Sequence, residues 1–146
     1  MNQGAILLVE DNPSDVGLTK RAFAKKNIAN PLVVVQDGQE ALDYLFCEGS
    51  YADRQSNDRP SVILLDINLP KISGLSVLRR IREDQRTRLT PVIMLTTSKE
   101  EQDLVTSYSN GANSYIRKPV DFSQFLEAVG QLGMYWLILN ETPQQP

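Results

Sequence analysis

Five short apolar segments recur along the chain, and each is followed by a stretch with helical periodicity. The segments span residues 5–9, 32–35, 62–65, 92–95 and, more weakly, 114–116. They are rich in aliphatic and β-branched residues and do not alternate with polar ones, a pattern typical of strands covered on both faces. Strands that alternate with helices predict an α/β fold built on a parallel sheet with right-handed crossovers.

Between these segments, apolar residues recur three or four positions apart, as on one face of a helix. The stripes are, in chain order, Thr19 and Phe23 with Leu18 and Ala22 beside them; Leu42, Leu45 and Phe46; Leu75, Leu78 and Ile81; Leu104, Val105 and Tyr108; and Phe122, Phe125, Leu126, Val129 and Leu132. Asn12 followed by Pro13 predicts a capped helix start. Residues 48–60 are polar and aperiodic, so we expect a long loop with room for one helical turn.

Length and composition limit the architecture and the chemistry. A chain of 146 residues suits one domain, which we expect over residues 1–140, with residues 141–146 as a flexible tail. The chain has no histidine and one cysteine, Cys47, which excludes histidine bases, Ser-His-Asp triads, disulfides within the chain and multi-cysteine metal sites. Its net charge of −3 argues against a basic nucleic-acid surface. With neither a signal-peptide pattern nor a membrane-spanning apolar run, we expect a cytoplasmic protein.

Polar side chains follow four of the predicted strands. Ligands of open parallel sheets bind at the carboxyl ends of the strands, so these residues are the candidate site. They are Glu10 and Asp11 after the first strand, Asp66 and Asn68 after the third, Thr96 and Thr97 after the fourth, and Lys118 after the fifth. Three carboxylates at one edge repel each other unless a cation neutralises them. Oxygen ligands without histidine or thiolate favour Mg²⁺, with Mn²⁺ as the alternative.

An aspartate at this edge can act as the nucleophile of phosphoryl transfer. The carboxylate of Asp66 would form an aspartyl phosphate, while Mg²⁺ and Lys118 stabilise the charge on the transferred group. The hydroxyl of Thr96 would donate to another phosphate oxygen. Each residue alone also has an ordinary structural explanation as a helix cap or a strand-end turn. Their coincidence at the strand ends predicts a phosphoryl acceptor centred on Asp66.

Over residues 4–132, these motifs resemble the receiver domains of two-component response regulators. The resemblance implies a flavodoxin-like sheet with strand order 2-1-3-4-5. It implies Mg²⁺ bound by Asp11, Asp66 and the backbone carbonyl of Asn68, with Glu10 acting mainly through water. It also implies a cis Lys118-Pro119 bond and a switch function for Tyr115. Such a protein signals and is not a general enzyme, since it catalyses only its own phosphorylation and dephosphorylation.

Several segments are similar to the single-domain regulators that are paired with bacterial phytochromes. They are residues 9–16, the insertion at 48–60, residues 66–70 and 95–98, and the pair at 135–136. This resemblance implies a sensor histidine kinase as partner, with a bacterial phytochrome as the specific candidate. Because no recognition helix follows the receiver-like region, we expect no output domain and no contact with DNA. Because no membrane-spanning apolar run is present, we expect no contact with membranes.

Two further expectations concern the phosphorylated state and self-association. Asn68 and the branched Thr97 border the phosphoryl position, and we expect Thr97 to slow the access of water. At residues 132–139, Leu132 and Trp136 continue the buried stripe of a helix. The remaining apolar residues, Tyr135, Ile138 and Leu139 with Met134, then point elsewhere. An apolar patch of this kind marks an interface, unless the helix end folds back over its own core. The resemblance to the phytochrome-type regulators implies that this interface is a homodimer through the fourth helix, fifth strand and fifth helix.

The main alternative is an Mg²⁺-dependent phosphatase of the haloacid-dehalogenase type, which also uses a strand-end aspartate. Such enzymes need a second acid two residues later, and Asn68 stands there. A flavodoxin would need a phosphate-binding loop where Glu10 and Asp11 stand, and no P-loop is present. The five arginines Arg79, Arg80, Arg82, Arg86 and Arg88 are expected to form a solvated helix face, with a partner surface as the alternative.

Overall fold

The computed structural model describes residues 4–25, 28, 30–55, 58–101, 111–134 and 137. Five parallel strands form one sheet in the order β2-β1-β3-β4-β5, which confirms the predicted topology. They are β1 (Ile6–Val9), β2 (Leu32–Val35), β3 (Val62–Asp66), β4 (Val92–Thr96) and β5 (Ser114–Arg117). Strands β3 and β4 therefore run one residue beyond the predicted segments, so that Asp66 and Thr96 are their last residues.

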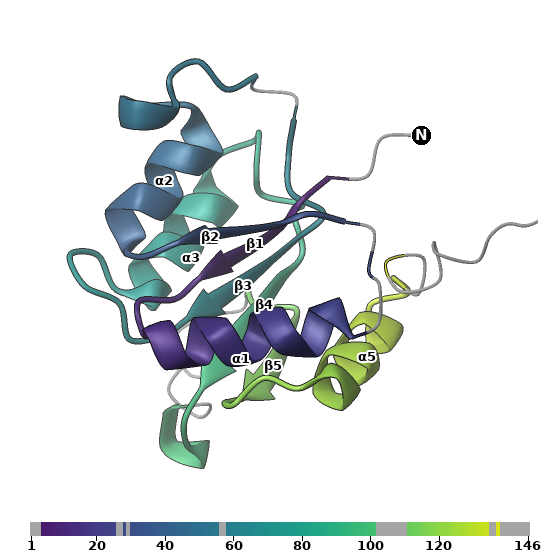
Figure 1. Cartoon of the computed structure of the whole chain (residues 1–146). Coiled ribbons are helices and arrows are strands. Elements are labelled where there is room, and N and C mark those ends of the chain that lie inside the picture. Colours follow the sequence, from purple (N-terminus) through teal and green to yellow (C-terminus); the bar gives the residue numbers. More distant parts are fainter. Residues whose placement is uncertain are drawn as a thin grey trace, which may run out of the picture.

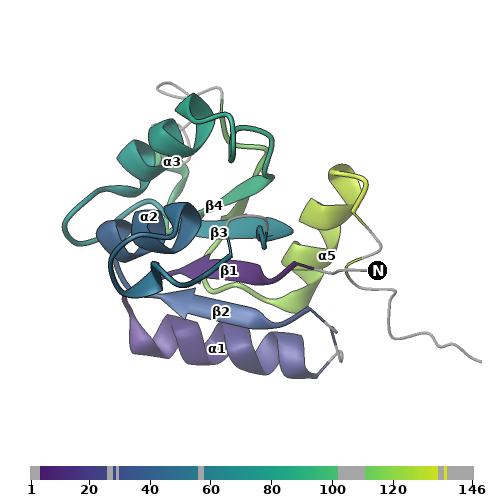
Figure 2. The ribbon, with the colours of Figure 1, turned by 90° about the horizontal axis from the view of Figure 1, so that it is seen from above.

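Helices cover both faces of this sheet (Figures 1 and 2). They are α1 (Pro13–Ala24) and α5 (Phe122–Gln131) on one face, and α2 (Gly38–Phe46) and α3 (Gly74–Glu83) on the other. A short 3-10 helix, η1 (Gly49–Tyr51), supplies the helical turn expected in the 48–60 loop. The predicted helix marked by Leu104, Val105 and Tyr108 lies outside the described residues.

Each face of the sheet has its own apolar core. Leu7, Ile63 and Met94 belong to the core beneath α2 and α3. Residues of the same strands one position away, such as Leu64 and Ile93, belong to the core beneath α1 and α5. Because successive strand residues point to opposite faces and both faces are covered, the strands carry no polar alternation.

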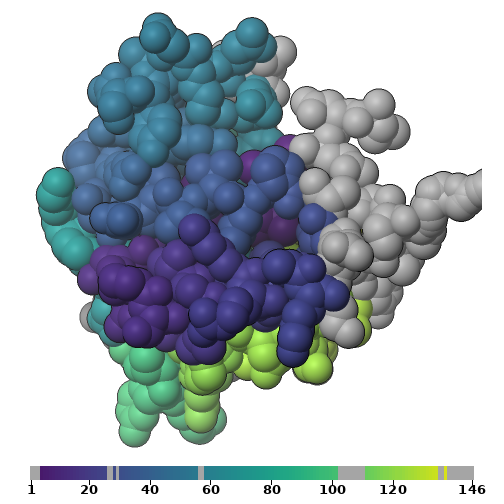
Figure 3. All heavy atoms as spheres, in the orientation of Figure 1, coloured from purple at the N-terminus to yellow at the C-terminus, as the bar shows by residue number. Residues whose placement is uncertain are grey.

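Helices α1 and α5 pack against each other as well as against the sheet. The rings of Phe23 in α1 and Phe125 in α5 have centroids 4.5 Å apart. In the space-filling view of Figure 3, the surfaces of α1 and α5 lie next to each other. The start of α1 agrees with its sequence signal, since Asn12 caps it by accepting from the backbone of Ser14 and Asp15, with Pro13 as the first helical residue.

The 48–60 loop is fastened to α2 by two side chains. The hydroxyl of Tyr51 donates to Glu40 at 2.6 Å. Arg54 donates to the backbone carbonyl of Tyr44 at 2.9 Å, and its guanidinium lies 4.0 Å from the centre of the Tyr44 ring. The loop therefore packs on the α2 side, away from α1 and α5.

The arginine-rich segment is only partly a solvated helix face. Arg79, Arg80, Arg86 and Arg88 are exposed, as expected. Arg82 differs, because its guanidinium donates to the backbone carbonyls of residues 88, 90 and 111 and to the side chain of Asn113. It thereby joins the end of α3 to the chain that enters β4 and β5.

The chain after α5 corrects one prediction. The helix ends at Gln131, and Gly133 adopts a left-handed backbone with φ of 71°. A continuous helix through Leu139 is therefore wrong, because the chain changes direction at Gly133. Met134 is 6% exposed and belongs to the core beneath α1 and α5, so its assignment to an exposed patch is also wrong. The other patch residues, Tyr135, Ile138 and Leu139, lie outside the described residues, as does Trp136.

Among the described residues, no helix is long and apolar enough to cross a membrane.

Two helical glycines should respond to alanine in opposite ways. A Cβ atom on Gly38 would lie 2.2 Å from the backbone oxygen of Ile72, whereas on Gly17 it would meet only the end of Arg21, at 3.5 Å. We expect Gly38→Ala to lower the free energy of unfolding by about 2 kcal/mol or more. As the matched control, Gly17→Ala should raise it by about 0.5–1 kcal/mol through helix propensity. Urea unfolding measures both, and equal effects would contradict the close packing at Gly38.

Candidate functional site

The polar residues predicted as a site lie together at the carboxyl edge of the sheet. One carboxylate oxygen from each of Glu10, Asp11 and Asp66 lies within 4.8 Å of the others. The side chains of Glu10 and Asp66 are 1% and 2% exposed, whereas Asp11 is open to solvent. Two of its carboxylates are therefore buried, and the third faces the solvent. Its donors are all carboxylate oxygens, which suits a hard divalent cation.

One lysine forms ion pairs with the two buried carboxylates of this cluster. The Nζ atom of Lys118 lies 3.2 Å from an oxygen of Glu10, 3.2 Å from one of Asp66 and 3.2 Å from one of Asp15. Lys118 follows β5 directly, and its backbone N–H donates to the carbonyl of Thr96 at 2.7 Å. The bond to Pro119 is cis, as expected.

The pKa values of these groups reflect burial and mutual charge. Burial, together with the charge of Asp66, raises the pKa of Glu10 from 4.5 to about 7, although Lys118 opposes the shift. Burial also raises the pKa of Asp66 despite the nearby ammonium. For Lys118, burial alone would lower the pKa, but the carboxylates of Asp66 and Glu10 outweigh it, so the pKa lies above its usual value. The lysine is therefore charged at any physiological pH.

The hydroxyl of Thr96 is buried at the end of β4, next to the strand that carries Asp66. Its Oγ1 atom has no hydrogen-bond partner within the described part of the chain. A buried hydroxyl without a partner costs free energy, so such groups are uncommon in folded proteins. An anion on Asp66 would give this hydroxyl an acceptor.

A further carboxylate, that of Glu101, connects the loops on either side of the site. It accepts from the backbone N–H of Thr97 at 2.8 Å and from the side-chain amide of Asn68. The backbone N–H of Asn68 in turn lies 3.3 Å from Oδ1 of Asp66. These hydrogen bonds outweigh the effect of burial and lower the pKa of Glu101. Glu101 therefore connects the loop after β3 with the loop after β4.

The backbone near Asp66 lies so close to the start of α3 that Gly74 has no room for a side chain. A Cβ atom on Gly74 would lie 2.1 Å from the carbonyl oxygen of Asp66. The N–H of Gly74 donates to the carbonyl of Ile67 at 3.0 Å. Glycine at this position lets α3 begin directly against the loop that carries Asn68.

The structure brings together most of the residues predicted from the sequence. Glu10, Asp11, Asp66, Asn68, Thr96 and Lys118 all lie at this edge. Thr97 is exposed beside it, so its expected effect on hydrolysis stays a prediction. Tyr115 is half-buried and packs on the core beneath α2 and α3, and its function as a switch also stays a prediction.

Sequence reasoning missed two carboxylates, Asp15 and Glu101. Both had a local signal, since Asp15 lies in the first turn of α1, just after Asn12, and Glu101 follows Ser98 with capping-box spacing. Each signal suggested only helix capping. Their contacts with Lys118 and Asn68 come from elements far apart in the sequence.

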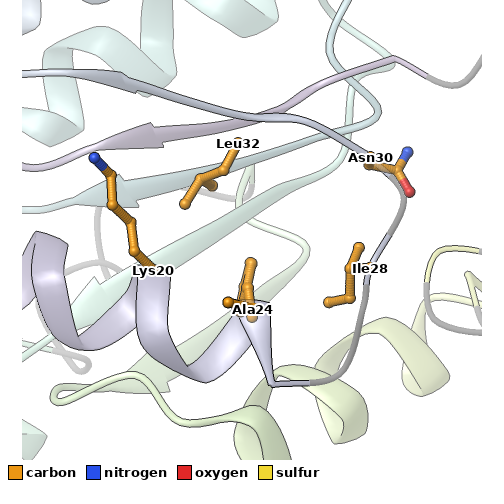
Figure 4. A pocket seen from close by; sticks show the side chains of 6 residues that line it. Lys20, Ala24, Ile28, Asn30 and Leu32 are labelled. Atoms are coloured by element: carbon orange, nitrogen blue, oxygen red, sulfur yellow. The ribbon is translucent and has the colours of Figure 1, made fainter.

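A groove elsewhere on the surface lacks this chemistry. It has a volume of about 480 Å³ and lies between α1 and the beginning of β2 (Figure 4). Its lining consists of Lys20, Phe23, Ala24, Ile28, Asn30 and Leu32. Because Leu32 is the first residue of β2, the groove lies toward the amino edge of the sheet, away from the acidic cluster.

Comparisons with known proteins agree with one another. The family model described as the response regulator receiver domain matches residues 6–130. The chain is 40% identical to the probable methanogenesis regulatory protein FilR2 of Methanothrix harundinacea, over 94% of this chain and 86% of that protein. It is 35% identical to the response regulator Rcp1 of Synechocystis, over 90% of this chain and 88% of Rcp1.

Solved structures include similar proteins at high coverage. The bacteriophytochrome response regulator AtBRR is 50% identical with a TM-score of 0.89, and the match covers 96% of this chain and 99% of that one. The Mn²⁺-bound form of Rcp1 is 34% identical with a TM-score of 0.73, and the match covers 98% and 99% of the two chains.

The raised pKa of Glu10 makes the stability of the metal-free protein depend on pH. A carboxyl with a raised folded-state pKa stabilises the fold below its ordinary pKa, and this contribution is lost as pH rises through the folded-state value. For Glu10 the loss falls between about 4.5 and about 7. With EDTA present, we expect Glu10→Gln to be more stable than wild type at about pH 8, by roughly 1–3 kcal/mol.

At about pH 5 this difference should be much smaller, because the folded protein then holds Glu10 mostly protonated. Urea unfolding at the two pH values checks the prediction. The matched control is Glu83→Gln, on the exposed surface of α3, which should show no such pH dependence. An equal gain for Glu10→Gln at both pH values would contradict the burial of its charge.

Proposed function

Because the chain belongs to the response regulator receiver domain family, we propose that it accepts a phosphoryl group on Asp66 from a sensor histidine kinase in an Mg²⁺-dependent reaction. One observation carries the choice of Asp66. Its buried carboxylate belongs to the cluster of carboxylate oxygens suited to a cation, and it also lies 3.2 Å from the ammonium of Lys118. The hydroxyl of Thr96, which has no hydrogen-bond partner among the described residues, gives further support.

The proposed cation site uses the carboxylates of Asp11 and Asp66 and the backbone carbonyl of Asn68, with Glu10 acting mainly through water. The all-oxygen donor set fits Mg²⁺, with Mn²⁺ as the alternative. A structure of the related Rcp1 is described as an Mn²⁺-bound form. When bound, the cation would neutralise charge on the transferred group.

The chain's own residues account for the rest of the transfer. An oxygen of Asp66 attacks phosphorus, the new P–O bond forms as the P–N bond to the kinase histidine breaks, and the histidine keeps the electron pair. Lys118 donates to one phosphoryl oxygen and Thr96 to another. The reaction needs no general acid. The residue two positions after Asp66 is Asn68, which agrees with this requirement. The side-chain amide of Asn68 cannot protonate a leaving group, so the phosphatase alternative has no support.

For the kinase we propose a bacterial phytochrome. AtBRR is described as a bacteriophytochrome response regulator, and its 50% identity to this chain exceeds the 40% of FilR2, whose name refers to methanogenesis. For the output we propose that phosphoryl on Asp66 draws the Thr96 hydroxyl toward it. Tyr115 then turns inward, and the population shifts between two packings of the surface formed by the fourth helix, β5 and α5.

Phosphorylation of Asp66 is tested with a small phosphodonor, such as acetyl phosphate, and with a purified phytochrome kinase. We expect a mass gain of one phosphoryl group with Mg²⁺ and none with EDTA. Asp66→Asn should stay unlabelled, whereas the exposed control Asp53→Asn should label like wild type. Labelling that persists in Asp66→Asn would rule out Asp66 as the acceptor.

A second expected outcome concerns the homodimer, which we propose forms through the surface of the fourth helix, β5 and α5. The apolar residues Tyr135, Ile138 and Leu139 in the printed sequence support it. By sedimentation equilibrium, wild type should dimerise at about 100 µM, near the weak end for a functional dimer, and the double variant Tyr135→Glu, Ile138→Glu should not. Leu89→Glu removes a leucine that is 86% exposed in the loop between α3 and β4, and this variant should dimerise normally. A monomeric wild type would contradict the proposal.

A further inference from the structure

Asp15 is a carboxylate at the site that the proposed reaction does not use. It lies in the first turn of α1, and its Oδ2 atom is 3.2 Å from Nζ of Lys118. Its side chain is 25% exposed, compared with 1% for Glu10 and 2% for Asp66. Asp15 is thus the most solvent-accessible of the three carboxylates that hold the lysine.

Local structure sets the position of this side chain. The backbone N–H of Asp15 donates to the capping oxygen of Asn12 at 3.1 Å, and its carbonyl accepts from the hydroxyl of Thr19 at 2.9 Å. Thr19 itself is buried. The first turn of α1 therefore holds Asp15 over Lys118. An acidic residue in a first turn is favourable for the helix dipole, but that role needs no contact with a buried lysine.

The number of donors on Lys118 is limited. An ammonium group has three hydrogens, and Glu10, Asp15 and Asp66 each have an oxygen 3.2 Å from Nζ. A phosphoryl group on Asp66 can take over the donor that Asp66 has in the unmodified protein. The donor directed at Asp15 becomes available to the phosphoryl group only if the Asp15 contact breaks.

We propose that Asp15 is a positioning residue that restrains Lys118 in the unmodified protein and competes with the incoming phosphoryl group for its ammonium. This inference rests on the proposed function, because it concerns regulation of the same site. The charge of Asp15 also repels a dianionic phosphodonor. Asp15 thus slows uncontrolled phosphorylation by small donors.

The consequence is clearest for acetyl phosphate. In that reaction an oxygen of Asp66 attacks phosphorus, the bond from phosphorus to the acyl oxygen breaks, and acetate leaves with the electron pair. We expect Asp15→Asn to raise the rate of labelling by about two- to fivefold. This range corresponds to the energy of an ion pair that keeps partial contact with water. The difference should shrink as salt is added, because salt screens exposed charges.

The rates are measured by intact mass with each variant saturated in Mg²⁺, so that altered metal affinity does not enter. Asp15→Glu, which keeps the charge, should stay close to wild type, and Glu83→Gln, which removes an exposed charge on α3, should not change the rate. Urea unfolding confirms that each variant is folded. An Asp15→Asn variant that is folded but labels no faster than wild type overturns the inference.

A second readout separates this inference from the proposed function. Nitrogen-15 NMR of the Lys118 ammonium, without phosphodonor, should show faster hydrogen exchange with water in Asp15→Asn than in wild type. If the exchange rate of the Lys118 ammonium is the same in Asp15→Asn and wild type, Asp15 does not restrain Lys118, even if Asp66 is phosphorylated. Absence of labelling in wild type, with faster exchange in Asp15→Asn, would instead remove the proposed function and leave the restraint standing.

Discussion

The contact between one ammonium and three carboxylates at the sheet edge is the interaction on which the rest of the site depends. Lys118 balances part of the negative charge of Glu10, Asp15 and Asp66. Asp11 is outside this set of ion pairs and is open to solvent. Buried charges of one sign are costly unless they are compensated. Burial, which the lysine only partly offsets, raises the pKa of both Glu10 and Asp66. Carboxylates gathered in this way favour a divalent cation.

The fold provides this arrangement through strand order and close packing. Placing β1 between β2 and β3 brings Glu10 next to Asp66, and β4 brings Thr96 beside them. The loop after β3 is held by Gly74 at the start of α3 and by Gly38 at the start of α2, both in contact with its backbone. Glu101 joins it to the loop after β4. A change on Asp66 therefore reaches several loops through direct contacts.

Much of this could be predicted from the sequence, because the informative signals are local. Uninterrupted apolar segments predicted strands covered on both faces, and the polar residues after four of these segments predicted the site. The contributions of Asp15 and Glu101 could not be found in this way, since each depends on a partner brought close only by folding. Met134 was misplaced because helical periodicity was extended past Gly133, where the backbone turns left-handed. Arg82 resembled its exposed neighbours in sequence, but its guanidinium donates hydrogen bonds to backbone carbonyls of two loops.

The central claim is that Lys118 and Thr96 are poised for an anion on Asp66. It is tested most directly by a crystal structure of the protein with Mg²⁺ and beryllofluoride, a stable stand-in for a phosphoryl group. The account predicts beryllofluoride bonded to Asp66, the Lys118 ammonium moved onto a fluorine and away from Asp15, and the Thr96 hydroxyl donating to a second fluorine. Beryllofluoride bound elsewhere, or bound to Asp66 while Thr96 remains without a partner and Lys118 stays on Asp15, would contradict it.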